Sequence, residues 1–324
     1  MPQSHRGMDG IAPIPKGDFM SYFLAVDAGG TKTEFLLADQ DRELARSLTG
    51  TIKRVNADEF AAENNLRQAL TDLTQATGIT MAQITRTCIG TSGNTVPLVT
   101  DWLRHSFEKY VSGPLLLLGD VEIALDAAFK GGPGVLALAG TGSNVAARAT
   151  GGAIMTAGGW GPMLADQGAG HWIGMEGLRR GFLARDEQRP TQLLELARQL
   201  WDLPTVDSLI EFANTQPAAR YAAQFAPQVV ACAEAGDEVA REILDQGGAD
   251  LAYLASLLIE RMRASEGTSF SVPQVAFAGS ILTKVERERT AFEKSLRAKY
   301  PDIRFIAEPV DPLNGALWRA IRGV

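Results

Sequence analysis

A chain of 324 residues is long enough for two domains, and its 45% hydrophobic and 21% charged residues are typical of globular proteins. The net charge of −7 provides no broad basic surface, so nucleic acid and anionic membranes are excluded as expected partners. Two cysteines, Cys88 and Cys232, lie far apart in apolar stretches and belong to no zinc or iron–sulfur pattern. They indicate reduced core thiols in a cytoplasmic protein.

The apolar runs of the chain are short, and none approaches the ~20 residues that a membrane helix needs. Residues 1–19 are rich in proline and glycine and lack a continuous apolar stretch. We therefore expect a flexible leader rather than a signal peptide, and a folded part that begins near Met20.

The first part of the chain predicts a mixed α/β sheet. Three strand-forming segments are separated by a glycine turn and a polar turn, the pattern of an antiparallel meander. These segments are Tyr22–Val26, Thr33–Ala38 and Leu44–Leu48. Helical and strand patterns then alternate, with helices expected at Ala57–Ala76, Val96–Tyr110 and Val121–Phe129 and strands at Ile84–Ile89 and Leu115–Leu118.

The opening pattern returns in the second part of the chain. Strands are expected at Val135–Ala139, Val145–Ala149 and Ala153–Thr156. The two strand–glycine-turn–strand units lie about 112 residues apart, from Gly30 to Gly142, which indicates a duplicated unit; two unrelated hairpins are the alternative.

The rest of the second part is predicted to be mostly helical. Ala169–Arg263 has helical patterns, with Gly236-Asp237 as the cap of its long helix. The remaining elements are a strand at Val272–Ala278, one helical stretch through Lys299, a strand at Ile303–Ile306 and a last helix from Asp311-Pro312.

Two glycine turns carry the first candidate chemistry. Asp27-Ala-Gly-Gly-Thr-Lys-Thr33 lies between two strands, where paired glycines let backbone N–H groups approach an anion and threonine hydroxyls donate to phosphate oxygens. Gly140-Thr-Gly-Ser-Asn144 offers a second such turn. Each turn alone is a common structural feature, but two turns that face each other would hold a triphosphate from both sides. The carboxylate of Asp27 can hold Mg²⁺, directly or through water.

Two further carboxylates follow predicted strands or loops. Asp120 comes after the Leu115–Leu118 strand, where it can serve a ligand in the crevice or cap the next helix. Asp166 lies in a glycine-dense segment with Trp160, and this loop can wrap a polar ligand. Alternatively, Trp160 is a core residue and Asp166 caps the helix from Ala169.

Taken in order, four segments resemble the N-acetylglucosamine kinase family, within the BadF/BadG/BcrA/BcrD-type ATPases of the actin-like superfamily. They are Asp27-Ala-Gly-Gly-Thr-Lys-Thr33, Gly140-Thr-Gly-Ser-Asn144, Gly158-Gly-Trp-Gly161 and Asp166-Gln-Gly-Ala-Gly-His-Trp-Ile173. The resemblance extends from Tyr22 over nearly the whole chain. It implies two actin-like (ribonuclease H-like) α/β domains with a nucleotide and sugar cleft between them.

The resemblance also implies domain boundaries and an assembly. Residues 20–120 plus 309–324 would form the N-terminal domain, and residues 121–308 would form the C-terminal domain with a helical insertion. The last helix would therefore pack back on the first domain. The family further suggests a homodimer.

The resemblance assigns ligand roles to individual residues. For ATP these residues are Asp27, Gly29, Gly30, Thr31, Lys32, Gly140, Thr141, Gly142, Ala226, Gly279 and Ser280. For the sugar they are Asn56, Asp120, Ser143, Asn144, Gly159, Trp160, Gly161 and Asp166. The loop before Asn56, Thr51–Val55, differs from the family's pattern.

The implied reaction is ATP- and Mg²⁺-dependent phosphorylation of an amino sugar at its 6-hydroxyl, with N-acetyl-D-glucosamine as the expected substrate and Asp120 as the base. Glucosamine or glucose could be the acceptor instead. The residues also leave open an ATP-hydrolysing regulator of the same fold, a sugar sensor without turnover, and a serine hydrolase that uses Ser92 with His105 or His171. Iron–sulfur activator ATPases and zinc-containing glucokinase-like proteins need cysteine ligands that this chain lacks.

Overall fold

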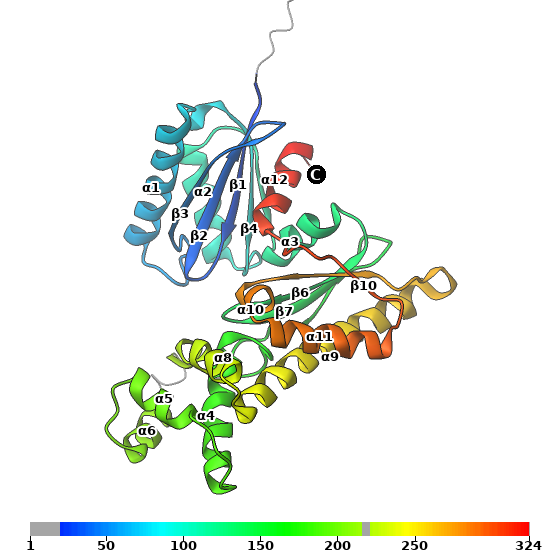
Figure 1. Ribbon diagram of the computed structural model, residues 1–324. Coiled ribbons are helices and arrows are strands. Elements are labelled where there is room, and N and C mark those ends of the chain that lie inside the picture. Colours follow the sequence, from blue (N-terminus) through cyan, green and yellow to red (C-terminus); the bar gives the residue numbers. More distant parts are fainter. Residues whose placement is uncertain (1–19, 216–220, 324) are drawn as a thin grey trace, which may run out of the picture.

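The computed structural model describes residues 20–215 and 221–323, and it contains two five-stranded sheets with helices on both faces (Figure 1). The expected leader, residues 1–19, lies outside the described residues. Each helix in the described ranges is too short or too polar to traverse a bilayer.

The first sheet has the strand order β3-β2-β1-β4-β5. Its strands are β1 (Tyr22–Ala28), β2 (Lys32–Ala38), β3 (Glu43–Gly50), β4 (Ile84–Thr91) and β5 (Leu115–Leu118). Strand β1 pairs antiparallel with β2, which pairs antiparallel with β3, whereas β1, β4 and β5 run parallel. The expected meander and the mixed sheet are therefore confirmed.

Helices cover both faces of this sheet because its central strand is apolar on both sides. The helices are α1 (Glu59–Thr77), α2 (Pro97–Tyr110), α3 (Asp120–Phe129) and α12 (Pro312–Arg322). Successive residues of a strand point to opposite faces. Leu24 and Val26 accordingly pack in the cluster that contains α1 and α2, and Phe23 and Ala25 pack in the cluster that contains α3 and α12.

The second sheet has the same strand order as the first. Read from the edge that corresponds to β3, its order is β8-β7-β6-β9-β10. Its strands are β6 (Gly134–Ala139), β7 (Ser143–Arg148), β8 (Ile154–Gly158), β9 (Gln274–Ala278) and β10 (Arg304–Phe305). Strands β6, β7 and β8 form the antiparallel meander, and β6, β9 and β10 run parallel. The shared strand order confirms the duplication that the glycine-turn spacing predicted.

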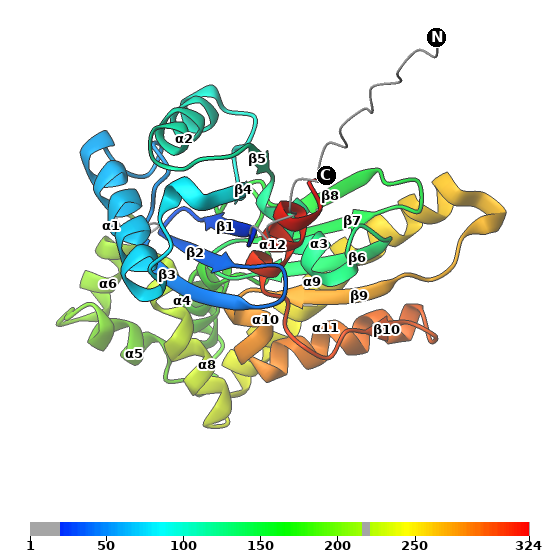
Figure 2. The same ribbon diagram turned by 90° about the horizontal axis from the view of Figure 1, so that it is seen from above.

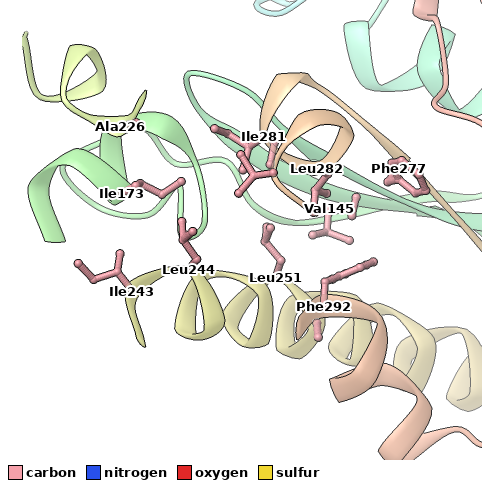
Figure 3. Packing of buried hydrophobic residues seen from close by; sticks show 14 of the residues in the cluster. Val145, Ile173, Ala226, Ile243, Leu244, Leu251, Phe277, Ile281, Leu282 and Phe292 are labelled. Atoms are coloured by element: carbon pink, nitrogen blue, oxygen red, sulfur yellow. The ribbon is translucent and has the colours of Figure 1, made fainter. Parts of the chain in front are cut away.

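Seven further helices belong to the described second half. They are α4 (Gly170–Asp186), α5 (Leu193–Leu200), α6 (Val206–Ala213), α8 (Ala226–Glu234), α9 (Glu238–Glu266), α10 (Ser280–Lys284) and α11 (Glu286–Lys299). Figure 3 shows Leu251 of α9 and Phe292 of α11 pointing toward Val145 of β7 in the main core of this half. Asp237 caps α9 as predicted, because its side chain accepts a hydrogen bond from the Ala240 N–H at 3.0 Å.

One expected helix is interrupted. The sequence predicted one helical stretch from Gly279-Ser280 through Lys299, but α10 ends at Lys284 and α11 begins at Glu286. Val285 between them has φ −97° and ψ 87°, outside the helical region, and its side chain is buried in the core. The two cysteines match their prediction, since Cys88 and Cys232 are both buried free thiols.

Helix α3 lies between the two sheets and contributes to both cores (Figure 2). Ile123 packs with residues of the first sheet, and Leu125 packs with residues of the second. On the same helix, the fully buried Asp126 forms ion pairs with Arg148 of β7 at 2.7 Å and Arg319 of α12 at 2.5 Å.

The C-terminal helix α12 packs on the first sheet and on α3. Asp311 caps it by accepting a hydrogen bond from the Leu313 N–H at 3.0 Å, and Pro312 occupies the first turn. Its buried face includes Leu313, Ala316 and Ala320, which join the cluster of β1 and α3.

Candidate active site

The parallel strands of the first sheet bring two carboxylates to one edge. Asp27 near the end of β1 is in register with Gly90 of β4, and Gly90 is in register with Leu118 of β5. Asp120 follows two residues beyond Leu118. Burial raises the pKa of Asp27 to about 7, and the nearby Asp120 carboxylate contributes to the shift. The two acids therefore lie close enough to interact.

A glycine in β4 allows α3 to start at this edge. A Cβ atom on Gly90 would lie 2.1 Å from Cδ1 of Ile123, so any side chain there would displace the Ile123 side chain of α3. The expectation that Asp120 is the cap of α3 is wrong. Gly119 takes the extended N-cap conformation, and Asp120 is the first helical residue, with its Oδ1 accepting a hydrogen bond from the Val121 N–H at 2.8 Å.

The first glycine turn is open to solvent beside these acids. Gly30, Thr31 and Lys32 are exposed, and the Lys32 ammonium pairs with Glu34. Asn56 lies next to the turn, since a Cβ atom on Gly30 would be 3.7 Å from its Oδ1. The structure thus brings Asn56 and the first glycine turn together.

The sequence interpretation missed Lys53, which lies at the same edge. Its side chain is buried, and its ammonium donates a hydrogen bond of 2.6 Å to the Ser92 hydroxyl. Burial lowers the pKa of Lys53, whereas the charges of Asp120 and Asp27 act in the opposite direction. Ser92, the nucleophile of the hydrolase alternative, therefore has a lysine as its hydrogen-bond donor.

The second glycine turn joins the starts of three helices. The N–H groups of Gly170 and His171 in α4 donate to the Gly140 and Thr141 carbonyls at 2.8 and 3.2 Å. A Cβ atom on Gly170 would lie 3.9 Å from the Ala226 Cβ at the start of α8. A Cβ atom on Gly140 would lie 4.0 Å from the Ser280 hydroxyl at the start of α10.

Gly279 is required where β9 meets α10. Its φ is +86°, in the left-handed region that side chains rarely adopt, and a Cβ atom there would lie 2.3 Å from the Ala139 carbonyl oxygen. The residues expected around adenosine, Ala226, Gly279 and Ser280, therefore gather around one end of β6 together with the second glycine turn.

The predicted sugar loop folds against the second glycine turn. The Asp166 carboxylate accepts hydrogen bonds from the backbone N–H groups of Ser143 and Gly161, and burial raises the pKa of this carboxyl. The Ser143 hydroxyl donates to the Gln167 carbonyl at 2.8 Å. Gly159 adjoins Asn144, because a Cβ atom on it would lie 2.8 Å from the Asn144 Cγ.

Two alternative expectations for this loop are wrong. Asp166 does not cap the following helix, because α4 begins at Gly170 with Ala169 as its N-cap and the Asp166 carboxylate is engaged with the loop instead. Trp160 is no core residue, because the loop extends beyond the end of β8 and leaves its side chain 73% exposed. Met163 and Leu164 are also exposed, so the loop presents an apolar surface to solvent.

Glu288, a second residue that the sequence interpretation missed, packs against this loop at Gly168. Glu288 of α11 is fully buried, and neither of its carboxyl oxygens has a hydrogen-bond partner among the described residues. Cβ atoms on Gly168 and Gly247 would lie 2.7 and 2.9 Å from its Oε1. Burial, with the Asp250 charge adding to it, raises the pKa of Glu288 well above its ordinary value.

Replacing Glu288 with glutamine is expected to stabilise the protein increasingly as pH rises. The unfolded carboxyl ionises near pH 4.5, whereas the raised pKa keeps the proton on the folded carboxyl to a higher pH, so wild-type stability falls above pH 4.5 by up to about 1.4 kcal/mol per pH unit. Glutamine is always neutral and removes this loss. Melting temperatures at pH 5.5 and 8 measure the effect, with Glu286→Gln, exposed on the same helix, as the control. Parallel pH profiles for wild type and Glu288→Gln would contradict it.

Two sheets of one strand order, each opening with a glycine turn after its first strand, form an actin-like fold. The chain belongs to the BadF/BadG/BcrA/BcrD ATPase family, whose model matches residues 24–318. The expected family and fold class are thereby confirmed.

Named relatives extend over the same length. The chain is 26% identical to the N-acetyl-D-glucosamine kinase of Dictyostelium discoideum and 22% identical to the N-acetylmuramic acid/N-acetylglucosamine kinase of Clostridium acetobutylicum, and each alignment covers 92% of this chain and 97% of the relative. A crystal structure from Chromobacterium violaceum, provisionally named an N-acetylglucosamine kinase, is 23% identical with a TM-score of 0.69. That match covers 92% of this chain and 98% of the other.

Proposed function

We propose that this protein transfers the γ-phosphoryl group of ATP to the 6-hydroxyl of an amino sugar, with N-acetyl-D-glucosamine as the preferred acceptor. The observation that carries the proposal is the meeting of Asp27 and Asp120 at one sheet edge, beside the exposed Gly30-Thr31-Lys32 turn. Membership of an ATPase family supports ATP as the donor, and the names of the relatives support an amino sugar as the acceptor.

The two glycine turns are proposed to bind the ATP phosphates. Backbone N–H groups of the turns and the hydroxyls of the exposed Thr31 and Thr141 are donors suited to phosphate oxygens. The phosphate-binding residues are Gly29, Gly30, Thr31, Lys32, Gly140, Thr141 and Gly142, and the adenosine-binding residues are Ala226, Gly279 and Ser280. The gathering of the latter three at one end of β6 supports their shared role.

The residues present fit a Mg²⁺ ion held together with ATP. Among the described residues there is no cluster of three metal-binding side chains. Mg²⁺ in phosphoryl-transfer sites is usually held by one or two carboxylates together with substrate phosphates, so the Asp27 carboxylate, directly or through water, is sufficient. The raised pKa of Asp27 reflects unfavourable negative charge at this position, which a cation relieves. When bound, Mg²⁺ supplies charge neutralisation to the phosphates.

In the proposed reaction, Asp120 accepts the proton of the sugar 6-hydroxyl as that oxygen attacks the γ-phosphorus. A new oxygen–phosphorus bond forms, the bond to the bridging oxygen breaks, and ADP leaves. Asn56, Ser143, Asn144 and Asp166, with backbone groups of Gly159 and Gly161, would position the sugar. The exposed Trp160, Met163 and Leu164 provide apolar surface suited to an acetyl group, which supports an N-acetylated sugar over glucosamine.

A screen of sugars with Mg²⁺ and ATP tests this function. ADP release that depends on N-acetyl-D-glucosamine, with the 6-phosphate identified by NMR, is the expected result. Preference for glucosamine or glucose would move the assignment to that sugar. ADP release that needs no sugar would favour the ATP-hydrolysing regulator, and sugar binding without ADP release would favour a sensor.

A homodimer in the cytoplasm and the expected domain boundaries stay predictions. Light scattering of the purified protein tests the dimer.

Replacing Thr141 with valine is expected to lower kcat/KM for ATP by about 10- to 100-fold, because one hydrogen bond to a charged phosphate is lost. Steady-state kinetics at saturating sugar measure the change. Thr150→Val, an exposed threonine at the other end of β7, is the matched control. Activity that persists in EDTA, or unchanged kinetics of Thr141→Val, would contradict the proposed nucleotide site.

A further inference from the structure

The loop between β3 and α1 is fastened to the first glycine turn. The Thr51 hydroxyl donates to the Gly29 carbonyl at 2.7 Å and accepts from the Lys53 N–H at 3.1 Å. The N–H groups of Asn56 and Ala57 donate to the Lys53 carbonyl at 2.9 and 3.0 Å. The backbone around Lys53 is therefore fixed relative to the turn.

The side chain of Lys53 is directed into the site. It is only 5% exposed, although an unpaired lysine is almost never buried. Its ammonium donates to the Ser92 hydroxyl at 2.6 Å, just beyond the end of β4, and interacts with the charges of Asp27 and Asp120. Ser92 is its one hydrogen-bond partner among the described residues, so two of its three N–H donors remain for a ligand.

We propose that Lys53 contacts the γ-phosphoryl group of ATP and stabilises its negative charge during transfer. This inference rests on the proposed function, and it assigns the cationic part of the site. Asp27 and Asp120 are both acidic, so a cationic side chain beside them adds to the charge neutralisation that Mg²⁺ on Asp27 would supply. The ammonium keeps its protons throughout, and the proton of the sugar hydroxyl still goes to Asp120. Ser92 is a positioning residue, because its hydroxyl accepts the hydrogen bond that fixes the ammonium just beyond β4.

A purely structural lysine that neutralises two partly buried acids is the competing explanation. It predicts that removal of the charge lowers stability but leaves nucleotide discrimination unchanged. A lysine that binds the sugar predicts a raised KM for the sugar with normal nucleotide binding. Contact with the γ-phosphoryl group predicts a selective effect on ATP, because ADP has no such group.

The test compares wild type with Lys53→Met, which keeps the length of the side chain without its charge. We expect kcat to fall by about 10²- to 10³-fold while KM for the sugar changes less than about threefold. Calorimetry in Mg²⁺ should show the affinity for a non-hydrolysable ATP analogue reduced by about tenfold or more, with ADP affinity changed less than about twofold. Lys109→Met, exposed on α2, is the control and should behave as wild type.

Equal losses for the ATP analogue and ADP, unchanged affinity for both, or a raised sugar KM alone would overturn the assignment. The nucleotide comparison needs no sugar, so it still tests Lys53 if wild type phosphorylates no amino sugar and the proposed function fails. If Lys53→Met does not fold, Ser92→Ala takes its place. That variant should lower kcat by about tenfold with ADP affinity unchanged, and full activity would overturn the proposal.

Discussion

Replacing Asp120 with asparagine is expected to lower kcat by about 10²- to 10⁴-fold, the usual cost of removing a general base. Asparagine has nearly the same size, and its Oδ1 can still accept the Val121 N–H that Asp120 accepts at 2.8 Å. The start of α3 should therefore persist. The asparagine cannot take the proton of an attacking hydroxyl at neutral pH. We expect melting temperature and sugar affinity to change little.

Steady-state kinetics measure the contribution of Asp120 as the base, and thermal melting of the same preparation measures its contribution to the start of α3. Asp237→Asn is the matched control, because Asp237 also binds a backbone N–H at a helix start, that of Ala240 at 3.0 Å, in the second half of the protein. If Asp120→Asn keeps more than about a third of wild-type kcat, Asp120 is not the base, and Asp166 becomes the next candidate.

Replacing Asp126 with asparagine is expected to destabilise the protein by about 3–5 kcal/mol, because it leaves the Arg148 and Arg319 charges without their buried partner. Asp126 is fully buried and Arg148 nearly so, which keeps water from replacing the lost carboxylate. The melting temperature should fall on the order of 10 °C. Since Asp126 joins elements of both halves, the loss should affect the whole molecule.

The control is Asp245→Asn, which removes the same kind of acid from an arginine pair on the surface. Asp245 and Arg287 lie 2.6 Å apart with about half of each side chain exposed, and such pairs contribute about 0–1 kcal/mol. Equal effects of Asp126→Asn and Asp245→Asn on melting temperature would show that burial of the Asp126 cluster adds nothing to stability.

Sequence patterns predicted the features of the fold that depend on residues close together in the sequence. The meanders and glycine turns follow from strand formers interrupted by glycine, and the shared edge of Asp27 and Asp120 follows from the parallel order of their strands. The break at Val285 was not predicted, because the helical pattern of the sequence continues through this residue. The break arises because Val285 is buried in the core of the second half, which the local pattern does not reveal. Asp120 was misplaced by one position because aspartate is itself a preferred cap.

The missed site residues owe their environment to contacts distant in sequence. Lys53 lies in the loop that departs from the family's pattern, and its partner Ser92 follows a different strand. Glu288 is part of a highly charged run, Glu286-Arg-Glu-Arg289, which is typical of an exposed helix surface. It is buried because Gly168 and Gly247 leave space for its carboxyl. Neither situation has a local signal in the sequence.

The packing of α12 has a consequence for the order in which the chain folds during synthesis. Phe23, Ala25 and Leu36 of the first sheet are covered by α3 and by Leu313 and Ala316 of α12. Their face cannot be completed until α12 has been synthesised, although these strands are made well before it. The second half has all five strands of its sheet before α12 is made. We therefore expect the second sheet to be covered by its helices before this face of the first sheet is covered. Chains truncated before Asp311 should leave this apolar face exposed and should aggregate.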